Sequence, residues 1–163
     1  DISGNVTVDN QSPVLQFEAD VNYSSYIRFS NGSTLQDGEI QYAPAVDTMY
    51  FRTNNTANRM SIDGSGNVVA AGNVTAYSDE RLKDNIETLD GSKVYEMRGV
   101  SFTKDGEAGS GVIAQELQKI APELVHEQDD YLSVAYGNLV GYLIEAVKDL
   151  KAEIEELKNA SAQ

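Results

Sequence analysis

The segment AYSDERLKDNI, residues 76–86, marks the place where the character of this 163-residue chain changes. Residues 1–77 contain eight acidic residues, three arginines and no lysine, whereas residues 78–163 contain eighteen acidic residues, two arginines and seven lysines. A shift in charge composition of this kind indicates a domain boundary. The sequence therefore predicts two domains, residues 1–77 and residues 78–163, which join at Ser78.

The overall composition excludes several classes of protein. The chain has no cysteine, so neither a disulfide framework nor a cysteine-ligated metal site is possible. The formal net charge is −14, and a chain this acidic does not bind DNA or an anionic membrane by charge alone. No apolar run approaches the ~18 residues of a membrane-spanning helix. We expect no cofactor and no metal, and we interpret the single histidine, His126, and the pair Asp129-Asp130 as surface groups.

Apolar and polar residues alternate in the first half of the chain with the period of two that is typical of β-strands. One predicted strand region runs from Phe17 through Tyr23 and Ile27 to Phe29, and shorter strands follow at 40–42, 49–51 and 60–62. Turn-forming pairs separate them: Asn31-Gly32, Asp37-Gly38 and Asp63-Gly64. These signals predict an all-β fold for residues 1–77.

A short repeat and a small number of apolar residues indicate that this β-structure is shared between chains. The sequence Asp1-Ile2-Ser3-Gly4-Asn5-Val6 returns as Asp63-Gly64-Ser65-Gly66-Asn67-Val68. Repeated short strands with glycine corners suit a fibrous fold. A small domain with few core residues needs additional stabilisation, and without cysteine we expect oligomerisation to supply it. The alternative is a small monomeric β-sandwich.

Residues 78–163 combine helical and strand patterns. Leu82, Ile86 and Leu89 lie at helical spacing and predict a helix over 79–89. Residues 94–97 and 100–103 are typical of strands, residues 104–107 of a turn, and the segment 111–117 leads into a short helix that ends before Pro122. The expected class for this domain is α+β.

The C-terminal stretch carries an unbroken heptad pattern. Apolar residues follow one another at spacings of 3-4-3-4-3: Val140, Leu143, Val147, Leu150, Ile154 and Leu157. Valine or isoleucine at a and leucine at d predict a coiled coil, and Glu153 and Lys158 have the g-to-e spacing of an interchain ion pair. By the usual rule these a and d residues favour two strands. The alternative is an ordinary amphipathic helix that packs on its own domain.

Three motifs in order along the second half carry a resemblance to a known family: SDERLKDNI at 78–86, GVIAQEL at 111–117 followed by PELV at 122–125, and LSVAY at 132–136. Residues 78–163 resemble the intramolecular chaperone domain of endosialidase-type phage tail spikes and fibres. Residues 1–77 resemble, more loosely, the glycine- and asparagine-rich tip of a phage tail fibre. The resemblance implies an α+β protein in which a fibrous, all-β trimeric tip precedes a small chaperone domain that ends in a long coiled-coil helix.

In this family the chaperone domain assists homotrimerisation of the fibre and then removes itself by autoproteolysis. The resemblance implies that the scissile bond is Tyr77–Ser78, that Ser78 is the nucleophile and that Lys83 is its base. It implies as partners the other chains of a homotrimer, upstream fibre strands and a host surface receptor, without nucleic acid or membrane insertion. The fibre part is expected in the virion tail fibre, and the chaperone part in the host cytoplasm during assembly.

The two residue types also suit this chemistry by themselves. A serine hydroxyl is a poor nucleophile until a base accepts its proton, and lysine can serve when burial lowers its pKa. Residues five apart lie about 140° apart on a regular α-helix, so Ser78 has to lie at or before the helix start, on a turn. The competing interpretation is that Ser78 is the N-cap of a helix that begins with Asp79 and Glu80. Asp79 and Gln115 are possible supporting residues, and Glu116 is a further candidate for support or for a helix start.

The sequence therefore supports two functions of different classes. The first is a self-cleaving intramolecular chaperone, a serine autoprotease that acts once on its own chain. The second is a permanent structural or receptor-binding fibre tip that is never cut. The two differ in the number of fragments that the purified chain should show on a gel.

Overall fold

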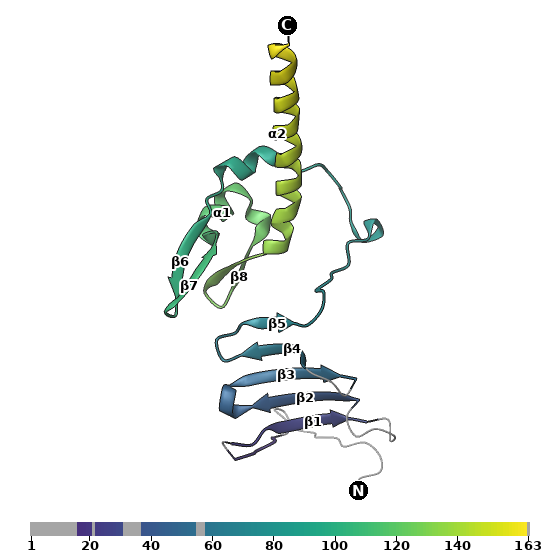
Figure 1. Cartoon of the computed structure of the whole chain (residues 1–163), viewed down its shortest axis with the longest axis vertical. Coiled ribbons are helices and arrows are strands. Elements are labelled where there is room, and N and C mark those ends of the chain that lie inside the picture. The colour runs from purple at the N-terminus through teal and green to yellow at the C-terminus, as the bar shows by residue number, and fades with distance from the viewer. Residues whose placement is uncertain (1–15, 21, 31–36, 55–57, 163) are drawn as a thin grey trace. The chain divides into compact units, whose positions relative to one another are not determined.

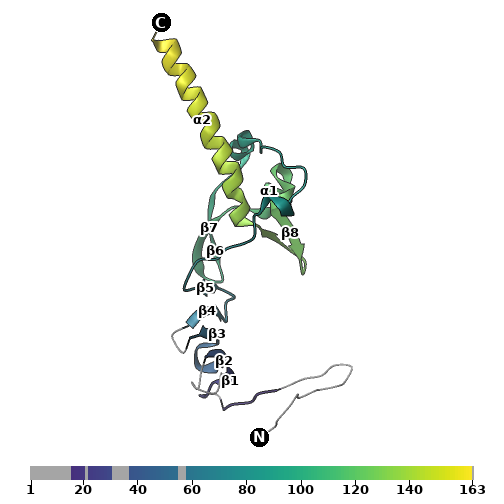
Figure 2. The same cartoon turned by 90° about the vertical axis from the view of Figure 1, so that its right-hand side faces the viewer.

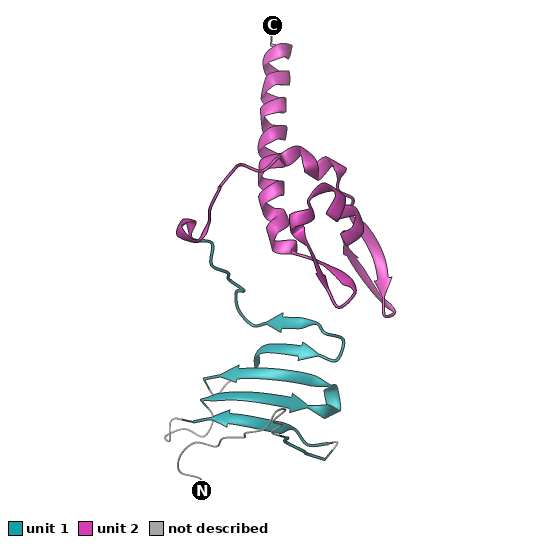
Figure 3. Ribbon diagram, turned by 180° about the vertical axis from the view of Figure 1, so that it is seen from behind, with its two compact units in different colours: residues 1–78 teal, residues 79–163 magenta. Residues whose placement is uncertain are grey.

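The computed structural model describes residues 16–20, 22–30, 37–54 and 58–162. The chain divides into two compact units, residues 1–78 and residues 79–163, which Figure 3 shows in teal and magenta. The described part of the first unit is built from strands, whereas the second unit combines helices with β-hairpins.

The first unit contains one antiparallel sheet in which each strand pairs with the next along the chain, in the order β1-β2-β3-β4-β5. Figures 1 and 2 show these strands as a single layer. The strands are β1 (Ser25–Phe29), β2 (Gly38–Ala43), β3 (Thr48–Thr53), β4 (Asn58–Asp63) and β5 (Val68–Ala70), with the 3-10 turn η1 (Pro44–Val46) between β2 and β3.

Side-chain hydrogen bonds shape the β4–β5 hairpin. Asp63 accepts hydrogen bonds from the backbone N–H of Ser65 (3.0 Å) and from the backbone and side-chain amides of Asn67 (2.9 Å each). The Asn67 side chain is the largest cause of a lowered pKa of the Asp63 carboxyl group. Gly66 has a φ of 80°, a left-handed conformation that favours glycine. The turn predicted at Asp63-Gly64 is confirmed, and the repeated Asp-x-Ser-Gly-Asn sequence is here a hairpin loop.

Most of the predicted strands of the first half are confirmed, since β1 contains Ile27 and Phe29 and the three shorter strands fall within β2, β3 and β4. The early part of the first strand region is wrong, because residues 16–20 form no strand. The backbone N–H of Tyr23 donates to the carbonyl of Asp20 (2.8 Å), and this turn interrupts the alternation before β1 begins. The predicted turn at Asn31-Gly32 and the first copy of the repeat, residues 1–6, lie outside the described residues.

The second unit combines two antiparallel hairpins, a short helix and a long C-terminal helix. β6 (Val100–Lys104) pairs with β7 (Glu107–Gly111), and β8 (Val125–Gln128) pairs with β9 (Tyr131–Val134). The helices are α1 (Ala114–Ile120) and α2 (Leu139–Ser161), joined to the other elements by the 3-10 helices η2 (Glu80–Leu82), η3 (Gly91–Glu96), η4 (Pro122–Leu124) and η5 (Tyr136–Asn138). Antiparallel sheets with a long terminal helix make the chain a mixed α+β structure, as the sequence predicts.

The hydrophobic core of the second unit lies where α1, η4 and β8 meet the first turns of α2. Its buried members are Leu117, Ala121, Leu124, Val125 and Tyr142. At the edge of this core the hydroxyl of Tyr142 donates a hydrogen bond to the carboxylate of Glu123. Burial, together with this carboxylate, raises the pKa of Tyr142 to about 12.

Two predicted elements of the second unit are wrong. Residues 79–89 form only the 3-10 turn η2 rather than a helix, because Leu82 and Ile86 are exposed and an isolated helix of this length is marginal in water. Residues 94–96 belong to η3 rather than to a strand, and Met97 is the C-cap of η3. Gly91 at the start of η3 packs directly on the backbone of α2 near Ala146, and this contact holds the segment in a helical turn.

The β8–β9 hairpin is an element that the sequence patterns did not reveal. Its two-residue turn is Asp129-Asp130, and both residues have positive φ angles, 50° and 65°. That backbone is typical of tight hairpin turns and favours asparagine, aspartate and glycine. The predicted surface position of this pair and of His126 is confirmed, since all three residues are exposed. The predicted strand at 100–103, which falls within β6, the turn near Asp105 and the short helix before Pro122 are also confirmed, whereas β7 was not predicted.

Candidate functional site

The motif that follows Tyr77 folds into one tight turn. Asp79 is the N-cap of η2, and its carboxylate accepts a hydrogen bond from the backbone N–H of Arg81 (2.9 Å). The Arg81 guanidinium also donates to both carboxylate oxygens of Asp79 (2.9 and 2.6 Å). This side-chain contact is the largest cause of a lowered pKa of the Asp79 carboxyl group. The sequence patterns did not reveal this role of Arg81, although its position two residues after Asp79 suits an ion pair across a tight turn.

Ser78 and Lys83 lie at the two ends of this turn. Ser78 immediately precedes the N-cap, and Lys83 is the C-cap residue, whose backbone N–H donates to the carbonyl of Glu80 (3.0 Å). Ser78 therefore lies before the helical turn, where the spacing argument requires it to lie. The interpretation of Ser78 as the helix N-cap is wrong, because Asp79 makes the capping hydrogen bond.

The segment around Tyr77 and Ser78 is open to solvent in the single chain. Tyr77 is 95% exposed, and every residue from 64 to 90, Ser78 and Lys83 included, is classed as exposed. A lysine that serves as a general base needs a desolvated environment. Within one chain, the described residues do not bury Lys83 in such an environment.

The two candidate residues on α1 differ in their surroundings. Gln115 is exposed beside a hollow of about 420 Å³, whose lining includes Phe102, Ser133 and Tyr136. The carboxylate of Glu116 instead binds the Arg98 guanidinium at 2.5 and 3.1 Å, which lowers the pKa of Glu116. Glu116 thus ties α1 to the segment before β6. Among the described residues, no group of three histidine, aspartate or glutamate side chains is placed to hold a metal ion.

The six predicted seam residues form a continuous exposed stripe along α2. Each is at least 45% exposed: Val140, Leu143, Val147, Leu150, Ile154 and Leu157. Ile144, which is 49% exposed, widens the stripe at its N-terminal end. Figures 1 and 2 show the C-terminal half of α2 running beyond the rest of the unit, and no residue from 147 to 162 is buried. Neither α2 nor another helix in the described ranges has the length and apolar character needed to span a membrane.

A neighbouring side of α2 is the side that its own domain uses. Tyr142 and Ala146 are 2% and 4% exposed. Gly91 lies against the α2 backbone at Ala146 and against the side chain of Asp149. α2 thus packs on its own domain, as the alternative interpretation expects, but it does so through Tyr142 and Ala146 rather than through the heptad stripe. The stripe is left without a covering surface in the single chain.

Comparison with known proteins shows which proteins the chain is similar to in sequence. Residues 78–126 match the family model described as chaperone of endosialidase. The chain is 33% identical over 143 residues to the long tail fiber protein Gp37 of Enterobacteria phage T2, and 36% identical over 105 residues to that of Enterobacteria phage K3. These matches cover 79% and 56% of this chain but only 10% and 8% of the relatives, so the chain spans about a tenth of their length. Residues 78–126 thus belong to the chaperone-of-endosialidase family, within a chain that is similar to phage long tail fibre proteins.

Proposed function

We propose that residues 78–163 are an intramolecular chaperone that brings three chains together and then cuts the Tyr77–Ser78 bond, which releases residues 1–77 as the end of a phage tail fibre. The exposed apolar stripe of α2 is the observation that carries the proposal, because it needs a partner that the single chain does not supply. The family match at 78–126 and the likeness to long tail fibre proteins support the same function.

Assembly through α2 follows from the division of its surface. One side of the helix is occupied by its own domain through Tyr142 and Ala146, and the heptad stripe faces solvent. A water-exposed helix gains most of its stability from packing of its apolar face, so the stripe favours helix–helix association. Ile144 occupies an e position and widens the stripe beyond the narrow a/d seam, which favours three helices where the a and d residues alone favour two.

Cleavage uses the ends of the η2 turn. The hydroxyl oxygen of Ser78 attacks the carbonyl carbon of Tyr77 while Lys83 accepts the hydroxyl proton, and the peptide C–N bond breaks as the proton passes to the freed amine of Ser78. The resulting ester between the Tyr77 acyl group and the Ser78 oxygen is hydrolysed by water. Asp79 and Arg81 hold the turn between the two residues. Gln115 of α1 is the proposed supporting residue, and no cofactor is required.

Because the site is exposed in one chain, assembly of the trimer comes before cleavage of the Tyr77–Ser78 bond. Lys83 needs a desolvated environment to act as a base, and its own chain leaves it exposed. Neighbouring chains of the trimer supply the missing cover, so cleavage follows assembly. Bringing three chains together raises the local concentration of the slow-pairing β-segments, and cleavage leaves a kinetically stable fibre.

The parts of the protein then have different destinations. Residues 1–77 remain in the virion tail fibre, joined to upstream fibre strands and available to a host surface receptor. Residues 78–163 act in the host cytoplasm during assembly. Neither part uses nucleic acid or inserts into a membrane.

The second candidate is a fibre end that stays uncut. The full exposure of the Ser78 segment in the single chain favours it, as does the description of the relatives as long tail fiber proteins. In that case α2 still holds three chains together, but residues 78–163 remain part of the mature fibre.

Mass spectrometry of the purified full chain separates these functions. We expect fragments of residues 1–77 and 78–163 from the wild type, and one intact chain from Ser78→Ala and from Lys83→Arg, because arginine keeps the charge but does not act as a base. Thr75→Ala, which removes a nearby hydroxyl, should be cut like the wild type. Light scattering should give trimers for all of these proteins. An intact wild-type trimer would establish the uncut fibre end, and a monomer would refute the chaperone.

A further inference from the structure

The five-stranded sheet of the first unit has two faces of opposite character. The strand registers place Ile40 of β2 between Ile27 of β1 and Phe51 of β3, and Phe51 opposite Met60 of β4. Since side chains alternate between the faces of a sheet, the same face carries Phe29, Tyr42, Met49, Ile62, Val68 and Ala70. None of the described strand residues assigned to this apolar face is charged.

The other face is polar, and its side chains bind one another except at the buried Oε1 of Gln41, which has no hydrogen-bond partner among the described residues. Glu39 is 4% exposed and binds Arg28 on β1 and Arg52 on β3, each at 2.8 Å. In the adjacent row the side-chain amide of Gln41 donates to the hydroxyl of Tyr26 (3.2 Å), and Arg28 lies 4.2 Å from the centroid of the Tyr26 ring. Long side chains of this face therefore cover Glu39 and Gln41.

Burial in the first unit is the reverse of what a water-soluble sheet needs. Its described buried residues are polar: Glu39, Gln41 and Thr48. Its apolar face is open, with Ile27 at 42%, Phe29 at 56% and Val68 at 62% exposure. All buried hydrophobic residues of the described chain lie in the second unit, between Leu117 and Ala146. The sheet thus has no apolar core of its own, although burial of apolar surface is the main source of folding free energy.

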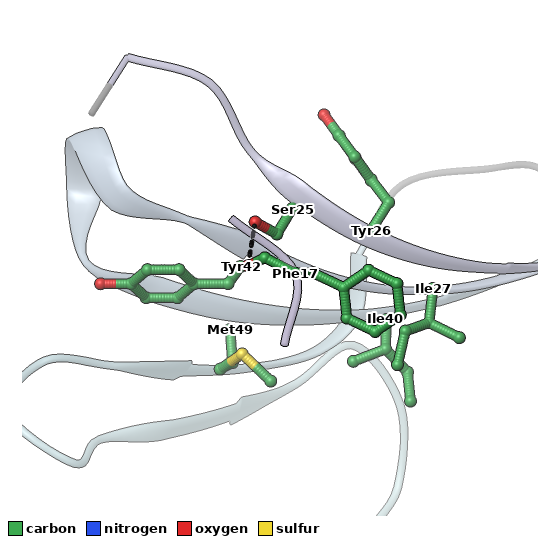
Figure 4. Close-up of a pocket in the computed structure, with 7 residues that line it drawn as sticks. All are labelled: Phe17, Ser25, Tyr26, Ile27, Ile40, Tyr42 and Met49. Carbon is green, nitrogen blue, oxygen red and sulfur yellow. Dashed lines mark hydrogen bonds between the residues drawn. The ribbon is translucent and has the colours of Figure 1, made fainter. Parts of the chain in front are cut away.

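The apolar face also contains a hollow that its own chain fills only in part. Figure 4 shows the ring of Phe17 beside Ile27 and Ile40, with Met49 at the side of the same hollow. The Ser25 hydroxyl donates to the carbonyl of Phe17 (3.3 Å) and holds this segment against β1. The remaining space is about 220 Å³. Its lining is chiefly apolar, so an apolar side chain from another molecule suits it.

We infer that the apolar face is the inner surface on which the sheets of the assembled chains pack against one another, and that the face with Arg28, Glu39 and Arg52 points outward. The inference rests on the proposed trimer and assigns its core in residues 1–77. The occupant is a second copy of this sheet, because association through α2 brings other copies of the same apolar face to a high local concentration.

Two neighbouring residues of β5 provide a matched test. Val68 and Val69 are the same residue type and are 62% and 63% exposed in the single chain, but Val68 pairs with Ile62 on the apolar face and Val69 pairs with Ser61 on the polar face. The chain has no cysteine, so Val68→Cys and Val69→Cys each introduce one thiol. We expect a maleimide to modify the native Val68→Cys protein at least tenfold more slowly than the Val69→Cys protein, and both at equal rates after denaturation.

A second pair, Ile62→Cys and Ser61→Cys on β4, repeats the comparison one strand further into the sheet. Light scattering on each labelled protein separates the inference from the trimer itself. Trimers in which both thiols of a pair react equally would overturn the assignment of the apolar face while leaving assembly through α2 intact. Monomers with equal reactivity would refute the trimer. Protection of Val69→Cys instead of Val68→Cys would reverse the orientation of the sheet.

Discussion

Gly91 lies against the backbone of α2 so closely that a methyl group on its α-carbon would come within 2.4 Å of the Ala146 nitrogen. The contact fixes which side of α2 faces its own domain. Because that side carries Tyr142 and Ala146, the heptad residues at a and d are left exposed. One glycine contact therefore makes the apolar stripe available for association.

Gly91→Ala should destabilise the second unit, because the added methyl group meets backbone atoms of α2 that cannot rotate away. Overpacking of this kind costs about 1–3 kcal/mol. Thermal unfolding of the full chain should show a lower melting temperature for the second unit. Gly99→Ala is the matched control, since nothing lies within 4 Å of the position of its added methyl group. Equal melting temperatures for both variants would contradict the contact.

Leu150→Asp should abolish or strongly weaken trimers, because a carboxylate would enter the centre of the proposed apolar seam. The domain itself should stay folded, since Leu150 is 45% exposed in the single chain. Ala152→Asp places the same charge at an f position of the same helix and should leave the trimer unchanged. Light scattering and circular dichroism on both variants report association and folding separately. Trimers from Leu150→Asp would show that the stripe is not the seam.

The stability of the second unit should fall at high pH because of Tyr142. Its pKa is raised from 10.0 to about 12, so the folded state holds the phenolic proton more tightly than the unfolded state. The resulting stabilisation, on the order of 2 to 3 kcal/mol, is complete below pH 10 and is lost as pH rises towards 12. Urea unfolding at pH 9 and pH 11 should show this loss in the wild type and a smaller one in Tyr142→Phe. Tyr131→Phe, at an exposed tyrosine, should behave as the wild type does.

Glu39→Gln should destabilise the first unit, because Arg28 and Arg52 would both lose the carboxylate that binds them. The arginines keep access to solvent, with side chains 47% and 32% exposed, so we expect a loss of about 1–3 kcal/mol rather than complete unfolding. The melting temperature of the assembled first unit measures the effect. Glu18→Gln, which removes an exposed carboxylate, should leave that temperature unchanged, and an equal shift in both variants would remove the special role of Glu39.

Asp79→Ala should slow cleavage several-fold while trimers still form, because the carboxylate that closes the turn between Ser78 and Lys83 would be lost. Asp79→Asn keeps an oxygen that can accept the Arg81 N–H and should be slowed less. The cleaved fraction over time on denaturing gels, with light scattering in parallel, measures both properties. Cleavage of Asp79→Ala at the wild-type rate would show that the turn does not position the site.

The sequence alone predicted those strands and helices whose apolar residues recur at a regular spacing. The apolar residues around Ile40, Phe51 and Ile62 predicted three strands of the sheet, and Asp63-Gly64 predicted the turn that follows β4. The 3-4 spacing from Val140 to Leu157 predicted the long helix. The SDERLK motif identified the family segment. In these cases the type of the element follows from the local periodicity of its residues, so the sequence contains the necessary information.

Only the tertiary structure decided the elements that depend on distant contacts. Leu82, Ile86 and Leu89 have helical spacing but form no helix, because the described chain leaves Leu82 and Ile86 uncovered. Residues 94–97 are strand-like in composition, but residues 94–96 form the end of η3 and Met97 caps it, because Gly91 at the start of η3 packs on α2. The sequence by itself determined that α2 has an apolar stripe. The fold decided that this stripe faces solvent, because the core formed by Leu117, Leu124 and Tyr142 occupies a neighbouring side of the helix.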